Sequence, residues 1–600
     1  MADDRIGVLD FGGQYAHLIA KRIRDLGVHS QIFSGDCRLE ELQGLKGIIL
    51  SGGPSSVSAG DAPEFDTRIL TSGIPVLGLC YGHQLVAYHL GGEVSKGRTR
   101  EYGKATVQVS DSVLLHGMDA VETVWMSHFD TVTRVPEGFT AVASTDICPI
   151  AAMEDPSRKI FSTQFHPEVT HTPHGMMALE NFVAVTGALR TWNVESYIPL
   201  LFEKIKTDAK GRKVFMLVSG GVDSTVCFVL LNKALGKDRV YGLHVDHGLM
   251  RKDESALVTK ALNAVGLDNF AVVDASERFL KALEGVLEPE IKRNIIGNLF
   301  LEVQKEEFVR LGLNADEWVL GQGTLYPDTI ESGGTKHADK IKTHHNRIPE
   351  IMAMIEKGLV VEPVADLYKD EVRKVGVELG LPDELVWRHT FPGPGLAVQE
   401  LCAATVVYPE NKQKLESDIG AMVASAGLRP FILPVRSVGV QGDERTYRSV
   451  VALQGEADWK TLEDLATTIT NTFPAVNRVV WLVKPAAVDL GSMTVKHGTL
   501  TRARLDLHRE ADALANQILR KHKLERELYE FPVVMIPVSF AGGESIALRP
   551  LYSENVMTVD FAKLPRAVVQ EMADAIGALP GIDAVFYDVT NKPPATVQWE

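Results

Sequence analysis

The sequence predicts a multidomain α/β protein followed by a duplicated α+β region, and three observations lead to this prediction. The chain has 600 residues, more than one hydrophobic core can organise, so several domains are expected. Its first two thirds alternate short apolar strands with helical stretches, and several of these strands end in glycine-rich turns. Its last third contains two pairs of similar segments in the same order, which is typical of an internal duplication.

Composition and charge exclude several classes of protein. The formal net charge is −16 at pH 7, which argues against general nucleic-acid binding, because phosphate backbones select for clustered Lys and Arg. No apolar run approaches the length of a membrane span, and the residues before the first apolar segment are acidic. We expect a cytoplasmic protein with neither a nucleic acid nor a membrane as partner. Five scattered cysteines without metal-type spacing are typical of a reducing compartment: Cys37, Cys80, Cys148, Cys227 and Cys402.

The first domain is predicted to contain a parallel sheet with a site at its carboxyl edge. A strand at Ile6–Phe11 is followed by a helical stretch from Tyr15 to Leu26. A second strand, Gly47–Leu50, ends in the turn Ser51-Gly52-Gly53-Pro54, and a third, Pro75–Leu79, runs directly into Cys80. Short parallel strands that end in glycine turns place functional groups at one edge of the sheet.

Cys80 lies in a nucleophile-elbow pattern, Gly78-Leu79-Cys80-Tyr81-Gly82. Small residues flank the nucleophile because the strand-to-helix turn is tight, and the helix N-terminus favours a thiolate. Taken alone, the pentapeptide favours a buried strand cysteine. A base two residues from a carboxylate, His166 and Glu168, changes this interpretation, because a Cys nucleophile needs a base and the base needs an orienting group.

The backbone amides of Gly53 and Tyr81 are the predicted oxyanion donors, although the Ser51–Pro54 loop is equally compatible with an ordinary turn. The pattern GxCYGxQ followed by QFHPE resembles the class I glutamine amidotransferase domain, over residues 1–192. This resemblance implies that glutamine forms a γ-glutamyl thioester on Cys80, which is hydrolysed to glutamate and ammonia.

A second glycine loop follows the predicted strand Lys213–Val218 and precedes an apolar helical stretch. Glycines let the backbone approach phosphate oxygens, and amides at the helix start can bind them. Asp223 can hold Mg²⁺, and the neighbouring hydroxyls can donate hydrogen bonds. No GxxxxGK[ST] pattern occurs, so a kinase-type P-loop is excluded. The predicted ATP-binding residues are Ser219, Gly220, Gly221, Val222, Asp223, Ser224 and Thr225.

SGGVDST resembles the PP-loop of ATP pyrophosphatases, and the predicted domain spans residues 193–389. The resemblance implies that ATP adenylates a carbonyl oxygen, that pyrophosphate leaves, and that ammonia then displaces AMP. The remaining residues, 390–600, contain the duplication: Phe431–Val440 resembles Val533–Phe540, and Ala475–Ala487 resembles Gly581–Ala595.

Segments along almost the whole chain resemble the glutamine-hydrolysing GMP synthetase family, in its longer, eukaryotic-like form. They are KRNIIG, GQGTLYPDTIESG, KIKTHHN, KDEVR, RHTFPGPGL, VGVQGDERTY and KPPATVQWE. The resemblance implies a ligase that aminates xanthosine monophosphate (XMP) to GMP, with glutamine, ATP and XMP as its small-molecule partners and Mg²⁺ accompanying ATP. It also implies that Asp328 and Glu331 assist the ATP and Mg²⁺ chemistry, and that a mobile lid carries Lys342, His344 and His345.

The same resemblance implies an XMP site and shows where this chain departs from the family. The matching positions are Arg293, Asp443, Glu530, Lys592 and Gln598. A family Gln corresponds to Glu530 and a family Glu corresponds to Gln598, so we hypothesise that both face one ligand and together keep one negative charge. A family Arg corresponds to Ala584, and its counterpart in the first repeat is Arg478.

Four other interpretations compete with this one. The nearest is a PP-loop amidotransferase that acts on a different purine nucleotide or analogue. NAD synthetase shares the PP-loop but lacks the thiol domain, and CTP synthase shares the thiol domain but phosphorylates its substrate. A retired, nucleotide-binding homologue is disfavoured by the intact Cys80, His166, Glu168 and Asp223. The two C-terminal modules can pair within one chain or between chains, so either a monomer or a homodimer is expected.

Overall fold

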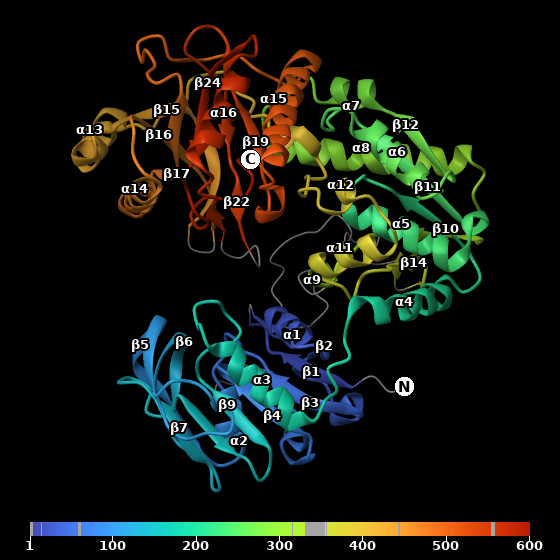
Figure 1. Ribbon diagram of the computed structural model, residues 1–600, viewed down its shortest axis with the longest axis vertical. Coiled ribbons are helices and arrows are strands. Elements are labelled where there is room, and N and C mark those ends of the chain that lie inside the picture. The colour runs from blue at the N-terminus through green and yellow to red at the C-terminus, as the bar shows by residue number, and fades with distance from the viewer. Residues whose placement is uncertain are drawn as a thin grey trace. The chain divides into compact units, whose positions relative to one another are not determined.

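The computed structural model describes residues 4–13, 15–57, 62–314, 316–329, 354–355, 357–441, 444–553 and 559–600 (Figure 1). It divides into two compact units, each described by itself below. The first unit is formed by Met1–Leu201, Thr324–Lys357 and Val364–Glu371, and the second by Phe202–Gly323, Gly358–Pro363 and Val372–Glu600. Among the described residues, no helix is long and apolar enough to cross a membrane.

The first unit is built on a nine-stranded mixed sheet in the order β2-β1-β3-β4-β9-β8-β7-β5-β6. The first five strands in this order are parallel: β2 (His29–Ser34), β1 (Arg5–Asp10), β3 (Leu45–Leu50), β4 (Val76–Leu79) and β9 (Ile160–Thr163). The others are antiparallel: β8 (Ala152–Asp155), β7 (Thr140–Ser144), β5 (Glu93–Val109) and β6 (Val121–Arg134). The parallel strands predicted for this domain are therefore confirmed.

Both faces of this sheet are buried, which explains the almost continuous apolar runs of its parallel strands. Side chains of α1 (Ala16–Asp25) and α3 (Gly175–Thr186) join one core, together with Ile6 and Val8 of β1. Side chains of α2 (Tyr81–His89) join the core on the opposite face, together with Leu9. This alternation along one strand follows from the two-residue period of a β-strand.

Two segments from later in the chain also belong to the first unit. Helix α9 (Tyr326–Thr329) contributes the Tyr326 hydroxyl, which accepts a hydrogen bond from the Ile32 amide at 2.8 Å. Helix α11 (Lys369–Glu378) contributes its first turn, where the carboxylate of Glu371 lies 2.9 Å from the buried Arg24 guanidinium. Burial of a charged Arg is tolerated here because the carboxylate and the Asp366 carbonyl both accept from it.

The second unit begins with a five-stranded parallel sheet in the order β12-β11-β10-β13-β14. Its strands are β10 (Lys213–Leu217), β11 (Val240–Asp246), β12 (Phe270–Asp274), β13 (Trp318–Gly321) and β14 (Val360–Val361). Its helices are α4 (Val194–Ala209), which begins in the first unit, α5 (Val222–Leu235), α6 (Glu254–Ala264), α7 (Ser276–Ala282), α8 (Pro289–Arg310) and α12 (Asp383–Val386). The second predicted α/β fold is confirmed.

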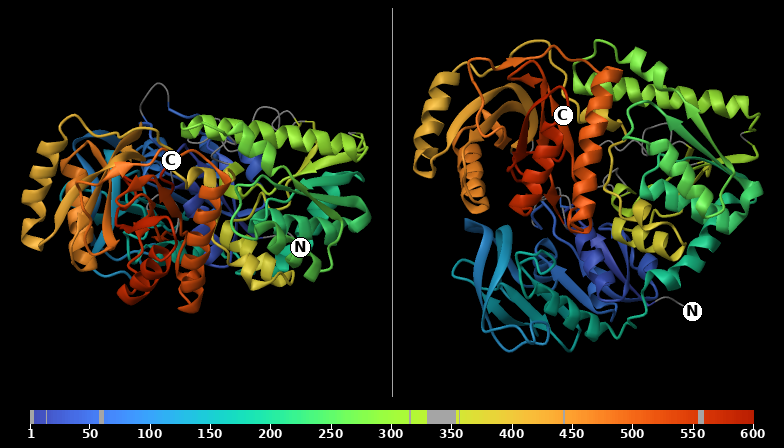
Figure 2. Two further views of the ribbon diagram at one scale, coloured as in Figure 1. Left: turned by 90° about the horizontal axis from the view of Figure 1, so that it is seen from above. Right: turned by 45° about the horizontal axis from the view of Figure 1, so that its top comes forward.

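A six-stranded sheet in the order β15-β16-β17-β24-β21-β19 completes the second unit (Figure 2). One half contains α13 (Lys412–Val423), β15 (Arg429–Gln441), β16 (Glu444–Gln454), α14 (Trp459–Thr472) and β17 (Val476–Lys484). The other contains α15 (Arg502–Lys521), β19 (Val533–Ile536), β20 (Val538–Ser539), β21 (Glu544–Leu548), α16 (Arg566–Gly577) and β24 (Ile582–Asp588). Smaller strands are β18 (Thr494–Val495), which pairs with β20, and β22 (Leu551–Tyr552), which pairs with β23 (Asp560–Phe561).

The two halves repeat one element order, which confirms the predicted duplication. In each half an antiparallel pair is followed by a parallel one: β15/β16 then β16/β17, and β19/β21 then β21/β24. The halves meet where β17 and β24 pair antiparallel, within one chain. Helix α14 shows why these sequences fold this way, since the Asp458 side chain accepts from the Thr461 amide at its start and Leu462, Ala466 and Ile469 bury one face.

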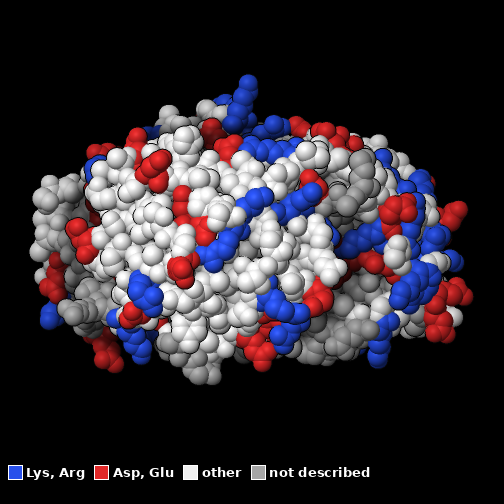
Figure 3. Space-filling view, turned by 90° about the horizontal axis from the view of Figure 1, so that it is seen from below, with Lys and Arg blue, Asp and Glu red and all other residues white. Residues whose placement is uncertain are grey.

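Basic and acidic side chains alternate over the face of the molecule in Figure 3, where neither sign forms a continuous field among the coloured residues. Local nucleotide binding then depends on backbone amides and a few placed cations, and not on a general field.

Candidate active sites

Cys80 occupies a strained turn between β4 and α2. Its φ of +53° lies in the left-handed region, which an L-residue adopts only when the surroundings impose it. Glycine is required on both sides: a Cβ at Gly78 would lie 2.4 Å from the Gly82 carbonyl oxygen, and a Cβ at Gly82 would lie 2.3 Å from the Leu50 carbonyl oxygen. The spacing GxCxG thus follows from the close approach of the backbone at Gly78, Gly82 and Leu50. The sharp turn directs the thiol away from the line of the strand.

His166 and Glu168 lie in hydrogen-bond contact, as the predicted triad requires. Nδ1 of His166 is 2.7 Å from Oε1 of Glu168, and both side chains are buried. The His166 ring and Cys80 flank the same glycine, since a Cβ on Gly52 would lie 3.3 Å from Cε1 of His166 and 3.7 Å from Cβ of Cys80. Glu168 therefore orients the imidazole by one nitrogen and leaves the other ring edge for the thiol.

The loop that carries the pair is fixed by hydrogen bonds from its neighbours. The Thr172 hydroxyl donates to the His166 carbonyl at 2.7 Å, and the Arg22 guanidinium of α1 donates to the Glu168 carbonyl at 3.0 Å. The His166 amide donates to the Trp125 carbonyl of β6 at 3.0 Å. The backbone of residues 166–168 is thus held by hydrogen bonds with the Arg22 side chain of α1 and with the Trp125 carbonyl of β6. The position of the base therefore does not depend on the thiol.

The electrostatics of the triad favour a charged imidazole. Burial lowers the pKa of His166, but the negative charges of Glu168 and Cys80 outweigh this effect and raise the pKa to about 10. Below that pH the imidazole keeps its proton, which it can donate to a leaving amine. As pH rises through the pKa this acid is lost, so glutamine hydrolysis should have a limb on the basic side.

Replacing Glu168 by Gln is expected to move that basic limb to lower pH. The change removes the larger of the two negative charges that raise the pKa of His166, while burial still lowers it. We also expect kcat for glutamine hydrolysis to fall about 10²-fold, because the acid is lost earlier and its orientation is weaker. The check is a pH profile of glutaminase activity for both proteins; a basic limb at the wild-type pH in Glu168→Gln would contradict this assignment.

The predicted oxyanion donors lie beside the elbow. A Cβ on Gly53 would approach the Tyr81 ring to 3.4 Å, and the Gly82 amide donates to the Ser51 carbonyl at 3.1 Å. The Tyr81 amide is at the N-terminus of α2, where backbone N–H groups have no partner within the helix. The two predicted donors thus come from adjacent loops, and their role remains a prediction.

Two glutamines near the thiol were missed by the sequence analysis. Gln164 Nε2 lies 3.7 Å from the Cys80 sulfur, and Gln84 Nε2 donates to Gln164 Oε1 at 3.1 Å and to the Asp130 carbonyl at 2.9 Å. Both side chains are buried. Gln84 is the last residue of the GxCYGxQ pattern, and Gln164 begins QFHPE, so the two motifs themselves contained the signal. These amides fix the orientation of groups around the nucleophile.

The second predicted site begins where β10 ends and α5 starts. Gly221 is the N-cap of α5 and Gly220 has φ +85°, so the chain turns sharply into the helix. The Ser219 and Ser224 hydroxyls lie 3.0 Å apart, and those of Ser224 and Thr225 donate to the Gly221 carbonyl. The loop is therefore preformed, with its amides at a helix N-terminus that favours phosphate.

The loop also has the donor set that a hard cation prefers. Asp223 lies in the first turn of α5, next in sequence to Ser224, whose hydroxyl is in contact with that of Ser219, and Mg²⁺ binds carboxylate, phosphate and hydroxyl oxygens. On the other side, Arg388 donates to the Gly220 carbonyl at 3.3 Å and pairs with Glu254 of α6. Arg388, the first residue of the segment RHTFPGPGL, thus ties the turn at Gly220 to Glu254 of α6.

Glu530 and Gln598, the two positions with exchanged identities, are in direct contact. Gln598 Nε2 donates to Glu530 Oε1 at 2.7 Å, although the residues are 68 apart in the chain. Arg293 of α8 reaches the same tail, because its Nη2 donates to the main-chain oxygen of Glu600 at 2.5 Å. The structure thus brings Arg293, Glu530 and Gln598 to one segment, the tail 592–600, which also contains Lys592.

Tyr529 connects these residues to the ATP loop. Burial raises the pKa of its phenol, and the carboxylates of Glu530 and Asp223 raise it further against the opposing charge of Arg373. Both carboxylates therefore lie within electrostatic reach of one side chain. Glu530 of the predicted acceptor site and Asp223 of the predicted phosphate loop thus act on the same phenol within the second unit.

Some predicted residues are not part of this arrangement. Asp443, Glu331, Lys342, His344 and His345 lie outside the described residues. Asp328 lies in α9 of the first unit, where its carboxylate accepts from the Leu325 amide at 3.0 Å. Ala584 is buried in the core of the C-terminal sheet, and Arg478 is fully buried against Asp588. Arg478 therefore supports the fold and does not replace the missing family Arg as a ligand contact.

Comparison with known families matches three parts of the chain. Residues 7–185 match the model described as Glutamine amidotransferase class-I. Residues 194–329 match NAD synthase, and residues 533–599 match the GMP synthase C terminal domain. The first match contains the Cys80 triad, and the second contains the Ser219–Thr225 loop. The third contains Lys592 and Gln598.

Named relatives match over most or all of this chain. A probable GMP synthase [glutamine-hydrolyzing] from Leptospira interrogans is 45% identical over 99% of both chains, and a GMP synthase from Dictyostelium discoideum is 35% identical over 100% of this chain and 94% of its own. The Geobacillus kaustophilus enzyme is 45% identical over 81% of this chain and 99% of its own. The longer form therefore occurs in a bacterium as well as in a eukaryote. By these similarities, the chain belongs to the GMP synthase (glutamine-hydrolysing) family.

Proposed function

We propose that this protein is a glutamine-dependent GMP synthetase that adenylates XMP with ATP and aminates it with ammonia from glutamine. The observation that carries the proposal is the presence, in one chain, of a complete Cys-His-Glu arrangement and a preformed phosphate loop at a helix start. Neither arrangement alone specifies this reaction. Together they supply ammonia and an activated carbonyl.

In the first half-reaction, the Cys80 sulfur attacks the side-chain amide carbon of glutamine. The C–N bond breaks, and the leaving amine takes the proton of His166 to become ammonia. Water then attacks the thioester, with His166 as base, to give glutamate and the free thiol. Glu168 keeps the imidazole in position through both steps by the 2.7 Å contact with Nδ1.

In the second half-reaction, a carbonyl oxygen of XMP attacks the α-phosphorus of ATP. The bond between the α- and β-phosphates breaks and pyrophosphate leaves, held by amides of the Ser219–Ser224 loop. Mg²⁺, when bound at Asp223, would neutralise phosphate charge. Ammonia then attacks the activated carbon, and AMP leaves with the former carbonyl oxygen. Arg293, Lys592, Glu530 and Gln598 would hold the XMP.

The decisive experiment incubates the protein with ATP, Mg²⁺, glutamine and XMP and measures pyrophosphate and GMP. Equal amounts of both products are expected. Pyrophosphate release with another purine nucleotide, but not with XMP, would overturn the acceptor and favour the alternative substrate. That alternative is motivated by the departures from the family at Glu530, Ala584 and Gln598; Ala584 replaces a family Arg and is buried in the sheet.

The contact between Glu530 and Gln598 gives a second prediction. Because they share a hydrogen bond of 2.7 Å, Glu530→Gln and Gln598→Glu should each raise the KM for XMP about tenfold. The first change removes the negative charge of this pair, and the second places two carboxylates together. The double exchange restores one carboxylate and one amide, so the KM should return to within about threefold of the wild-type value.

The measurement is the KM for XMP in the two single variants and in the double variant, with free ammonia as nitrogen donor. Strictly additive losses in the double variant would refute a shared ligand pocket.

The state of assembly is also part of the proposal. The pairing of both modules within one chain supports a monomer, and a homodimer is the alternative. Light scattering after size exclusion decides between them. A cytoplasmic location is also part of the proposal.

A further inference from the structure

Lys292, in the first turns of α8, is a lysine with no exposed surface. Its ammonium donates to the Ala397 carbonyl at 2.8 Å and the Glu400 carbonyl at 3.3 Å, and it forms an ion pair with the Glu600 side chain. Burying an ammonium costs free energy unless carbonyls and a carboxylate surround it. These contacts hold the Lys292 ammonium in one position, and they hold the Ala397, Glu400 and Glu600 groups around it as well.

The next residue contacts the same partner. Arg293 donates to the main-chain oxygen of Glu600 at 2.5 Å and to the Glu290 carboxylate at 2.7 Å. Two successive residues of α8 therefore bind the side chain and the main chain of one residue. Arg293 keeps a quarter of its side chain exposed, at 26%, so it can still meet a ligand while Lys292 cannot.

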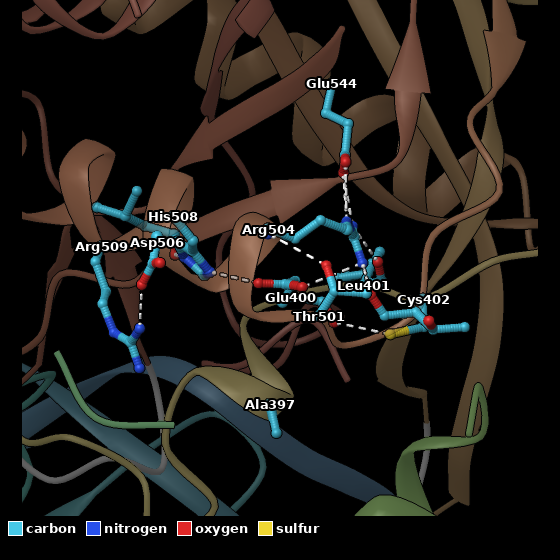
Figure 4. Close-up of polar contacts among 12 residues, drawn as sticks. Ala397, Glu400, Leu401, Cys402, Thr501, Arg504, Asp506, His508, Arg509 and Glu544 are labelled. Carbon is cyan, nitrogen blue, oxygen red and sulfur yellow. Dashed lines mark hydrogen bonds and ion pairs between the residues drawn. The ribbon is translucent and has the colours of Figure 1, made fainter. Parts of the chain in front are cut away.

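The segment that receives Lys292 is itself anchored to the C-terminal sheet. Figure 4 shows the Glu400 carboxylate between Arg504 and His508 of α15, at 3.1 and 3.5 Å. Arg504 also donates to the Leu401 carbonyl at 3.1 Å and pairs with Glu544 of β21 at 2.6 Å. The Leu401 amide donates to the Met535 carbonyl of β19. Lys292 thus links α8 to the sheet through residues 397–401.

The tail before Glu600 is anchored from its other side. Trp599 is buried, and its indole N–H donates to Asp588 at 3.0 Å. The same carboxylate pairs with two fully buried arginines, Arg478 at 2.5 Å and Arg549 at 2.8 Å. Both arginines donate to the Thr596 carbonyl. Gln598 therefore lies between two fixed points of the chain, with its side chain directed to Glu530.

We infer that Glu600 is a positioning residue for the acceptor nucleotide. Paired with Lys292, it fixes the distance between Arg293 on α8 and Gln598 on the tail, the two sides of the proposed XMP site. The inference rests on the proposed function, because it takes these residues as ligand contacts. Glu600 itself has its carboxylate buried against Lys292 and does not touch the substrate.

The test compares Glu600→Ala, Glu600→Gln and the double variant Lys292→Met/Glu600→Ala with the wild type, using the whole chain and free ammonia. Glu600→Ala removes the side-chain contact with Lys292 and leaves only the main-chain contact with Arg293, so the KM for XMP should rise about tenfold while the KM for ATP stays within twofold. Gln keeps an acceptor for the Lys292 ammonium, so Glu600→Gln should recover part of the loss.

The double variant separates positioning from stability. Glu600→Ala leaves an unpaired buried ammonium and should lower Tm, whereas removing both partners leaves no lone charge and should restore part of Tm. The KM for XMP should stay high in the double variant, because the side-chain contact between α8 and residue 600 is still missing. Glu571→Gln, which removes an exposed ion pair with Lys521 in the same unit, is the matched control and should change neither value.

Each outcome has a separate meaning. A lower Tm with an unchanged KM for XMP in Glu600→Ala would overturn the inference and make the ion pair merely structural. Recovery of KM together with Tm in the double variant would overturn it too. If the wild type neither binds XMP by calorimetry nor forms GMP, the proposed function fails, whichever result the variants give.

Discussion

Cys80→Ala is expected to lower glutamine-dependent product formation about 10⁴-fold or more, because no other group in the triad can form the thioester. Synthesis from free ammonia should continue at near the wild-type rate, since the second half-reaction needs the amine and not its source. The measurement is GMP formation with ATP and XMP, once with glutamine and once with ammonium chloride. Residual glutamine-dependent synthesis above 1% of the wild-type rate would contradict the role of the thiol.

Cys37 provides the matched control for that experiment. It is a second buried thiol of the first unit, in the core beneath the sheet, and burial raises its pKa to about 12. A thiol with so high a pKa stays protonated and is a poor nucleophile. Cys37→Ala should therefore keep both activities, with only the small loss of stability that a core truncation causes. A large loss with glutamine in this variant would point to general damage of the first unit.

The parts of the fold that could be predicted from the sequence are those that local pattern determines. The elbow at Cys80 was recognisable because it needs glycine two residues away on either side, where an added Cβ would lie 2.4 and 2.3 Å from a carbonyl oxygen. The pair His166 and Glu168 was recognisable because two residues on an extended segment project to one side. The glycine loop at Ser219–Ser224 was recognisable because a strand ends and a helix begins there.

Contacts between distant residues were harder to predict. The exchange of Glu and Gln at 530 and 598 suggested one pocket, and their hydrogen bond supports it. Nothing in the sequence indicated that Lys292 meets Glu600, 308 residues away, because a lysine in a helical segment is usually solvated. Arg478 was considered as a ligand contact, yet its partner Asp588 is 110 residues away. Burial of a charge depends on tertiary packing, which a single sequence does not reveal.

The duplication explains why position 584 holds an alanine where the family has an arginine. Arg478 in β17 and Ala584 in β24 occupy equivalent positions, since each pairs with the strand before it in its own half. A second arginine at 584 would bring another buried charge into a sheet that already holds Arg478, Arg549 and Asp588. Only one carboxylate pairs with these two arginines in the described residues. Ala584 therefore fits a fused arrangement in which the two modules are no longer identical.

Gly220→Ala is expected to lower pyrophosphate release about 10²-fold with XMP and free ammonia as substrates. Gly220 has φ +85°, and a Cβ there would lie 2.7 Å from Cγ2 of Val258 in α6. The turn must shift to relieve this contact, and the amides that would bind the phosphates move with it. The measurement is pyrophosphate formed per second at saturating ATP, together with Tm.

Gly236→Ala separates a local effect on the phosphate loop from a general loss of stability. Gly236 ends the same helix, α5, with φ +88°, and a Cβ there has no atom within 4 Å. Both variants place an L-residue at a positive φ, which costs about 1–3 kcal/mol, so both should lose some Tm. Only Gly220→Ala should lose pyrophosphate release, because only its end of α5 carries the proposed phosphate loop. Equal activity losses in the two variants would show that the loop has no special role, and the nucleotide would then have to bind elsewhere in the second unit.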